Sequence, residues 1–274
     1  MKEKLKGAGR YIYQEGTVYI ILVALIVFFS IFNPKFLSSR NLYNLITQST
    51  YIVIAGMGIC FVMISGGIDL SVGYQMAVCG CVAAIIMLET TLPVWVVWPV
   101  CIVLGLPLDV YLAIAVVAAT WIVLNKTHFG RDVLAVGGNK ECERLSGIRS
   151  DLIQTLCFTL TGGIFAIATL DMLAQQNQTS ATTGPGTEIT CLTAAIIGGI
   201  SMMGGKGNVV GMVAGIFVMQ MIANGMQLAG WGTYTQYIVK GVILLLAISF
   251  DAIKNYPKPV VRVHKEKAET TKAA

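Results

Sequence analysis

The chain has 274 residues, of which 55% are hydrophobic and only 12% are charged, and its mean hydropathy is +0.74. Soluble domains carry about 25% charged residues, so this composition excludes an ordinary soluble domain and indicates a membrane protein. The net charge of +5 does not indicate nucleic acid binding. The basic residues gather before the first apolar run, after the last one and in 126–149, which is typical of cytoplasmic flanks.

The apolar runs predict an all-α, polytopic membrane protein. A spanning helix needs about 20 mostly apolar residues, and the run at 17–33 has no small-residue cleavage site after it, so we expect a retained first span. Residues 93–107 contain three prolines and are expected to form an irregular or re-entrant element. About eight crossings are predicted, at 17–33, 46–65, 70–88, 108–125, 151–172, 188–203, 208–228 and 234–251.

The basic segments also predict the orientation, with both termini in the cytoplasm. If the start of the chain lies inside, Lys126 lies inside only when 93–125 makes a single net crossing. The expected organisation is a transmembrane domain over 1–253, with a cytoplasmic loop at 126–150, followed by a basic cytoplasmic tail at 254–274.

Two glycine-containing segments resemble each other. "ISGGIDLSVG" at 64–73 and "IIGGISMMGGKGNVVG" at 196–211 both place Gly-Gly-Ile between apolar runs. Paired interrupted spans indicate a transporter built from two loosely repeated halves. The residues expected to shape these helix breaks are Gly66, Gly67, Asp69, Gly204, Gly205, Lys206 and Asn208.

Asp69 has two interpretations. It can be the N-cap of a span beginning at Leu70, where its carboxylate accepts backbone N–H bonds and the helix dipole favours its charge. It can instead be an intramembrane carboxylate on a transport pathway. We favour the cap, because Gly66-Gly67 breaks the preceding helix and the crossing count places Asp69 near an interface. Asn208 is expected to cap the corresponding helix in the second half.

The most informative polar stretch is "FGRDVLAVGGNKECERLSGIR" at 129–149. Asn139 can cap a short helix over 140–145 that ends at Gly147. Such a capped, charged helix is either part of a solvated loop or a docking element for a soluble partner.

No enzyme signature is present. "GGKGN" at 204–208 lacks the spacing of a phosphate-binding loop, because Gly207 follows Lys206. The seven cysteines lie mostly in apolar runs and are expected to be free. We therefore expect no catalytic residue, no metal site and no cofactor bound by this chain.

The motifs together resemble the permease subunits of ribose-type sugar ABC importers. "SGGIDLSVG", "FGRDVLAVGGN", "RLSGI", "AAIIGGISMMGGKGNVVG" and "YTQYIVKGVILLLA" match that family in order over nearly the whole chain. The resemblance implies a permease in the bacterial cell membrane, paired with a second permease subunit as a homo- or heterodimer and surrounded by lipid. It also implies a cytoplasmic ATPase that holds ATP and Mg, an extracytoplasmic sugar-binding protein, and no nucleic acid.

The same resemblance implies an ATPase-docking loop. That family has Glu-Ala-Ala, three residues and Gly, and here Glu141 and Gly147 have this spacing, with Cys142 and Glu143 in place of the two alanines. The departure preserves the position of the loop but changes its packing. The expected docking residues are Gly138, Asn139, Glu141, Arg144 and Gly147.

The chain departs from that family a second time, because it passes from Leu88 to Lys126 in few residues. An even number of crossings can be lost there without inverting the docking loop.

The preferred function is a monosaccharide-importer permease, and the alternative is a shortened, non-transporting paralogue that acts as a membrane scaffold. A proton-coupled carrier ranks last, because few carboxylates lie along the spans. Candidate pathway residues are Gln75, Asn224, Gln227 and Gln236, each of which could equally form an interhelical hydrogen bond.

Overall fold

The computed structural model describes residues 2–77, 108–176, 184 and 186–255. Every regular element in these ranges is helical and none is a strand, which confirms the all-α prediction. Besides a helical stretch at 72–77, the helices are α1 (Lys2–Phe32), α2 (Ser39–Ile64), α5 (Leu108–Lys126), α6 (His128–Gly138), α7 (Lys140–Leu145), α8 (Ser150–Gln176), α9 (Thr187–Ile197), α10 (Val209–Leu228) and α11 (Thr233–Asn255).

Five of the described helices, α2, α5, α8, α10 and α11, are long and apolar enough to cross a membrane. The apolar part of α1, Gly16–Phe32, and α9 are shorter. With 11 residues, α9 rises about 16 Å, roughly half the hydrocarbon thickness. The crossing predicted at 188–203 and the total of eight are therefore not confirmed. Most of 70–88, and all of 93–107, lies outside the described residues.

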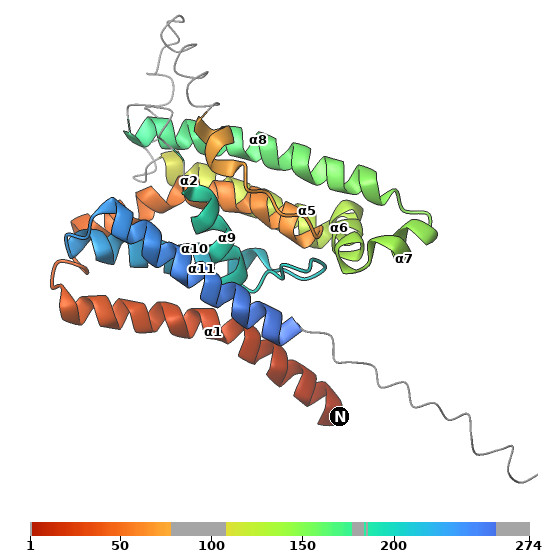
Figure 1. Ribbon diagram of the computed structural model, residues 1–274, viewed down its shortest axis with the longest axis horizontal. Helices are drawn as coiled ribbons and strands as arrows, with labels where there is room; N and C mark the ends of the chain where they lie inside the picture. The colour runs from red at the N-terminus through yellow and green to blue at the C-terminus, as the bar shows by residue number, and fades with distance from the viewer. Residues whose placement is uncertain (1, 78–107, 177–183, 185, 256–274) are drawn as a thin grey trace, which may run out of the picture.

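The centre of the fold is α2, which lies between α8 and α10 (Figure 1) and also contacts α5 and α9. Residues 52–64 of α2 are buried on every face, as expected for a helix that is apolar all round. Small residues let its neighbours approach closely. A Cβ at Gly56 would lie 2.6 Å from Ile216 Cδ1 on α10, and one at Gly58 would lie 2.9 Å from Phe165 Cε1 on α8.

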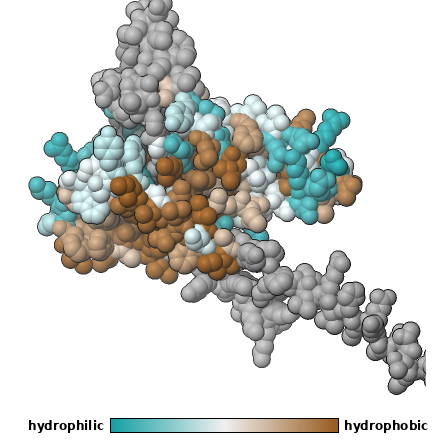
Figure 2. Space-filling view, in the orientation of Figure 1, coloured by the Kyte–Doolittle hydropathy of each residue, from teal (hydrophilic) through white to brown (hydrophobic). Residues whose placement is uncertain are grey.

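The helices α1 and α11 lie at the outside of the bundle and expose apolar side chains. Ile238, Leu245 and Phe250 on α11 are at least two-thirds exposed. Figure 2 shows apolar side chains gathered across the middle of one face, with polar side chains toward its ends. This is the surface of a helix bundle whose perimeter meets lipid tails.

One end of the bundle gathers the segments predicted to be cytoplasmic. The start of α1, the short helix α7 and the end of α11 all lie toward the right of Figure 1. This is the arrangement that the crossing count requires. The side of the membrane that this end faces stays a prediction.

Candidate transport site: polar cavity, glycine junction and docking helix

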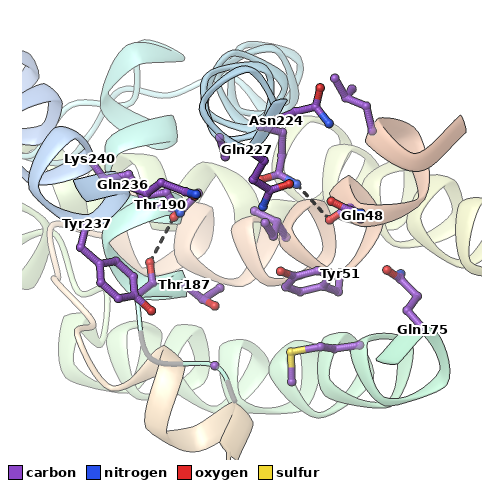
Figure 3. A pocket seen from close by; sticks show the side chains of 17 residues that line it. Gln48, Tyr51, Gln175, Thr187, Thr190, Asn224, Gln227, Gln236, Tyr237 and Lys240 are labelled. Carbon is purple, nitrogen blue, oxygen red and sulfur yellow. Dashed lines mark hydrogen bonds between the residues drawn. The ribbon is translucent and has the colours of Figure 1, made fainter. Parts of the chain in front are cut away.

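A polar cavity of about 550 Å³ opens at the end of the bundle away from α7. We call it the polar cavity. Its walls come from α2, α8, α9, α10 and α11, and Figure 3 shows their side chains pointing toward a common space. The polar lining consists of the amides of Gln48, Gln175, Gln220, Asn224, Gln227 and Gln236, the hydroxyls of Tyr51, Thr187, Thr190 and Tyr237, and the ammonium of Lys240. Among the described lining residues there is no carboxylate.

Three of the four predicted pathway residues line the polar cavity. The side chains of two of these three form hydrogen bonds within the protein. Asn224 exchanges two hydrogen bonds with Asn41, at 2.9 and 3.0 Å. Gln236 donates to the carbonyl of Trp231, whereas Gln227 is exposed into the cavity. Gln75 lies apart from the cavity.

Gln75 instead belongs to the entry of the helix at 72–77, where Nε2 donates to Ser71 Oγ. A glutamine in an apolar run does not reveal whether it faces a neighbouring helix or a cavity, and Gln75 is not among the residues that line the polar cavity.

Sequence reasoning missed most of the cavity lining. Gln48, Tyr51 and Lys240 lie within the predicted spans 46–65 and 234–251, and Gln175 lies three residues after the predicted span 151–172. The available signal was polar side chains inside predicted spans, which mark interhelical or pathway positions. Only the packing of the helices shows that these residues share one space.

Asp69 is buried, with 8% of its surface exposed. Its Oδ1 accepts the backbone N–H of Ser71 at 2.8 Å and the Ser71 hydroxyl. The helix begins at residue 72, two positions later than predicted. Asp69 therefore holds the turn that leads into this helix, and it does not reach the polar cavity. The corresponding residue, Asn208, is the N-cap of α10 and accepts the N–H of Val210 at 3.0 Å.

The two glycine-containing helix breaks meet each other and the end of α6. Gly205 N–H donates to the carbonyl of Ile64 at 2.9 Å. A Cβ at Gly204 would lie 2.7 Å from Gly66 Cα and 2.7 Å from the carbonyl oxygen of Gly137. Gly66 and Gly204 have φ of 82° and 79°, values that side chains disfavour. We call Gly66, Gly137, Gly204 and Gly205 the glycine junction.

The predicted docking residues lie beside the glycine junction. The helix α7 has the predicted bounds, and Asn139 caps it by accepting the N–H of Cys142 at 3.1 Å. Glu141 and Arg144 are exposed and form an ion pair of 3.5 Å. Gly147, with φ of 91°, ends the turn, while Gly138 precedes the cap. Lys206 is exposed at the same end.

A polar strut connects α7 to the centre of the bundle. Lys140 Nζ lies 2.8 Å from Asp151 Oδ1 and donates to Gln154 Oε1 at 2.8 Å. Gln154 Nε2 in turn donates to the carbonyl of Ser65 at 3.3 Å. The strut, which we define as Lys140, Asp151, Gln154 and Ser65, therefore links the predicted docking helix to the break that follows α2.

The described cysteines are free: Cys60, Cys157 and Cys191 are buried, and Cys142 is exposed. In the part of the chain that the structure describes, no group of three His, Cys, Asp or Glu residues forms a candidate metal site.

Comparison with known proteins gives a family and a set of relatives. The family model described as "Branched-chain amino acid transport system / permease component" matches residues 41–108 and 106–248. The ribose import permease protein of Haemophilus influenzae is 28% identical over 306 residues, 89% of this chain and 94% of that protein. The galactose/methyl galactoside import permease protein of Escherichia coli K12 is 27% identical, over 88% and 95% of the two chains.

A third relative matches a shorter region. The L-arabinose transport system permease protein of Escherichia coli K12 is 36% identical over 57% of this chain and 48% of that protein. No solved structure matches the chain.

The comparisons also bear on the length of this chain relative to its relatives. The two pieces of the family match meet at 106–108, between Leu88 and Lys126. The alignment to the Haemophilus protein spans 306 residues, more than the 274 of this chain, so that protein contains a stretch with no counterpart here. The length difference agrees with a shortened chain, and the place of the missing stretch in the middle stays a prediction.

Proposed function

The chain belongs to the family of transport-system permease components, and from that premise we propose that it forms the membrane pathway of an ATP-driven importer for a monosaccharide. The resemblance to sugar permeases stated from the motifs supports this substrate class, as do the ribose, galactose and arabinose permeases among its relatives. The particular sugar is left to experiment.

The observation that carries the proposal is the chemistry of the polar cavity. Its lining offers amides, hydroxyls and aromatic rings, and Lys240 is the one charged group among the described lining residues. Neutral sugars present many hydroxyls that both donate and accept hydrogen bonds, as side-chain amides do. A volume of about 550 Å³ lies within the roughly 300–1,000 Å³ of small-molecule sites.

The energy source in this proposal is a separate ATPase that docks on α7 and holds ATP and Mg. Glu141, Arg144 and Gly147 are presented at the end of the bundle, and the strut connects that helix to the break after α2. A movement of α7 would reach the glycine junction through these bonds. An extracytoplasmic sugar-binding protein would deliver the substrate to the opposite end, and both termini would lie in the cytoplasm.

The test is uptake of radiolabelled ribose, galactose and arabinose into proteoliposomes that contain this chain and its cognate ATPase and binding protein. We expect ATP-dependent uptake of at least one sugar, and its loss in the double variant Glu141→Ala, Gly147→Ala. Wild-type uptake by that variant would refute docking on α7. Co-purification with the ATPase but no uptake of any of the three sugars would favour a non-transporting scaffold.

A further inference from the structure

Lys240 is the one cationic side chain among the described residues that line the polar cavity. It lies on α11, whose first residue is Thr233, and therefore about 10 Å along the helix axis from its start. Its ammonium forms neither an ion pair nor a hydrogen bond with any residue that the structure describes. An ionisable group inside a spanning helix is costly and marks a pathway or a binding position, so this ammonium is available to a ligand.

The helix α11 turns a polar face to the cavity. Gln236, Tyr237 and Lys240 all line the cavity, and their spacing places them on one side of the helix. The apolar side chains of Ile238 and Leu245 on the other side are exposed. Figure 3 shows the three polar residues together on one side of the cavity, away from Gln175 on α8.

Three amides of the cavity wall have already used their N–H groups within the protein. Gln175 donates from Nε2 to two side-chain oxygens, at 2.6 and 3.2 Å. Gln220 and Gln236 each donate from Nε2 to a backbone carbonyl, at 3.1 and 3.0 Å. The carbonyl oxygens of these amides accept no hydrogen bond from the described residues. An amide oxygen only accepts, whereas an ammonium only donates, so the wall and Lys240 are complementary in what they offer a ligand.

We propose that Lys240 is the specificity-determining residue of the polar cavity, which donates to one oxygen of a neutral sugar while the amide oxygens accept from its other hydroxyls. The inference rests on the proposed function for the class of substrate. A sugar hydroxyl can donate and accept, so one molecule satisfies both sets of groups. A site built to hydrogen-bond one substrate oxygen rejects an analogue that lacks it, because the buried group of the protein is then left unpaired.

The surroundings of Lys240 favour a neutral ligand over one that carries a carboxylate. The carboxylate of Glu188 accepts the N–H of Gly186 at 3.0 Å with both of its oxygens. Gly186 lines the cavity and packs against α11, since a Cβ there would lie 2.7 Å from Tyr237 Cε1. A negative charge of the protein therefore already stands beside the wall that carries Lys240 and offsets its positive charge.

Ligand-observed NMR with the purified full chain in lipid nanodiscs tests the contact. The probes are ribose, galactose and arabinose, together with their monodeoxy and monodeoxyfluoro analogues. Fluorine can accept a hydrogen bond but cannot donate one, and a deoxy position can do neither. At one position of the sugar, we expect the wild type to bind the fluoro analogue more tightly than the deoxy analogue. Lys240→Met should weaken binding of the parent sugar about tenfold or more and abolish that difference, whereas Lys240→Arg, which keeps a charged donor, should preserve it.

The matched control is Lys35→Met, in the exposed turn after α1, which should bind all probes as the wild type does. Wild-type binding by Lys240→Met, or an unchanged difference between fluoro and deoxy analogues, would overturn the proposal, as would no binding of any of the three sugars to the wild type. Tighter binding of galacturonate than of galactose, lost in Lys240→Met, would identify a carboxylate site instead and also overturn it. Because the measurement needs no ATPase, binding through Lys240 without uptake would refute the proposed transport alone. Uptake with unaltered binding by Lys240→Met would refute the role of Lys240 alone.

Discussion

The two ends of this bundle are built in different ways. At one end the glycine junction brings three backbone segments into contact, and the positions of its atoms are fixed by main chain against main chain. At the other end the polar cavity is surrounded by side chains from five helices that leave space between them. The difference indicates that the glycine junction can pass on a movement of the backbone, whereas the polar cavity has room for a ligand. Substitutions at the junction should therefore change mainly stability, and substitutions in the cavity mainly uptake.

The largest effect is expected at the glycine junction. In Gly137→Ala, the added Cβ would overlap the carbonyl oxygen of Ile64 and lie 2.5 Å from the backbone nitrogen of Gly205. Overpacking costs about 1–3 kcal/mol and occasionally more, and backbone atoms cannot rotate away. We expect a loss of at least 3 kcal/mol, visible as a large fall in Tm or failure to purify in detergent.

The adjacent Gly138 provides the matched control, because a Cβ there meets nothing within 4 Å. Gly138→Ala should leave Tm unchanged or slightly raised, since alanine is favoured over glycine in helices by up to about 1 kcal/mol. Equal destabilisation by the two substitutions would mean that the close approach at Gly137 does not determine stability at this end.

The next effect belongs to the rim of the polar cavity, where Asn41 and Asn224 form a reciprocal amide pair between α2 and α10. Asn224→Ala leaves the buried amide of Asn41 with one partner fewer, at a cost of about 1–3 kcal/mol. A double-mutant cycle with Asn41→Ala, measured by unfolding, should give a coupling energy of about 0.6–1.7 kcal/mol.

The exposed Asn44, three residues after Asn41 on α2, serves as the control for this pair, and Asn44→Ala should be neutral. A coupling energy indistinguishable from zero would show that Asn224 contributes to the cavity wall and not to helix association. It would return this residue to the substrate pathway that its sequence position first indicated.

A smaller effect, on uptake alone, is expected at Gln227, whose side chain is exposed into the cavity. Gln227→Ala should leave stability within about 0.5 kcal/mol of the wild type. The loss of one hydrogen bond to a bound sugar is worth roughly 0.5–1.5 kcal/mol, or about twofold to tenfold in uptake efficiency at low sugar concentration. A fall in Tm without a change in uptake would contradict the assignment of Gln227 to the pathway.

Local structure was predictable from the sequence wherever a capping residue and the helix it begins lie in the same short segment. The helix α7, with its Asn139 cap, follows from a capping residue before a charged stretch, and Asn208 caps α10 for the same reason. The start of the helix after Asp69 was predicted two residues early, because a carboxylate followed by serine can form a turn before the first helical residue.

Arrangement between segments was less accessible. The similarity of 64–73 and 196–211 indicated related breaks, but only the fold shows that Gly66 and Gly204 touch each other. Lys240 was missed as a cavity residue, because a span that is apolar nearly all round carries no clear periodicity to assign its faces. Gln175 was missed because it lies beyond the predicted end of its span, at residue 172.

The strut between the two kinds of structure should give the smallest change in stability and the most specific change in function. Lys140 and Asp151 are 42% and 86% exposed, so Lys140→Met should cost no more than about 1 kcal/mol. Lys140 nevertheless holds Gln154 toward the carbonyl of Ser65, next to Gly66. Without Lys140, the ATPase should still dock, but less of its movement should reach the glycine junction.

The measurement is the ratio of sugar imported to ATP hydrolysed, which should fall in Lys140→Met at unchanged ATPase binding. Arg144→Met, which breaks the other exposed ion pair of α7, should weaken ATPase binding instead and preserve the ratio. If both variants reduced binding and ratio together, docking and transmission would be one function of α7, and the two ends of the bundle would not be coupled through the strut.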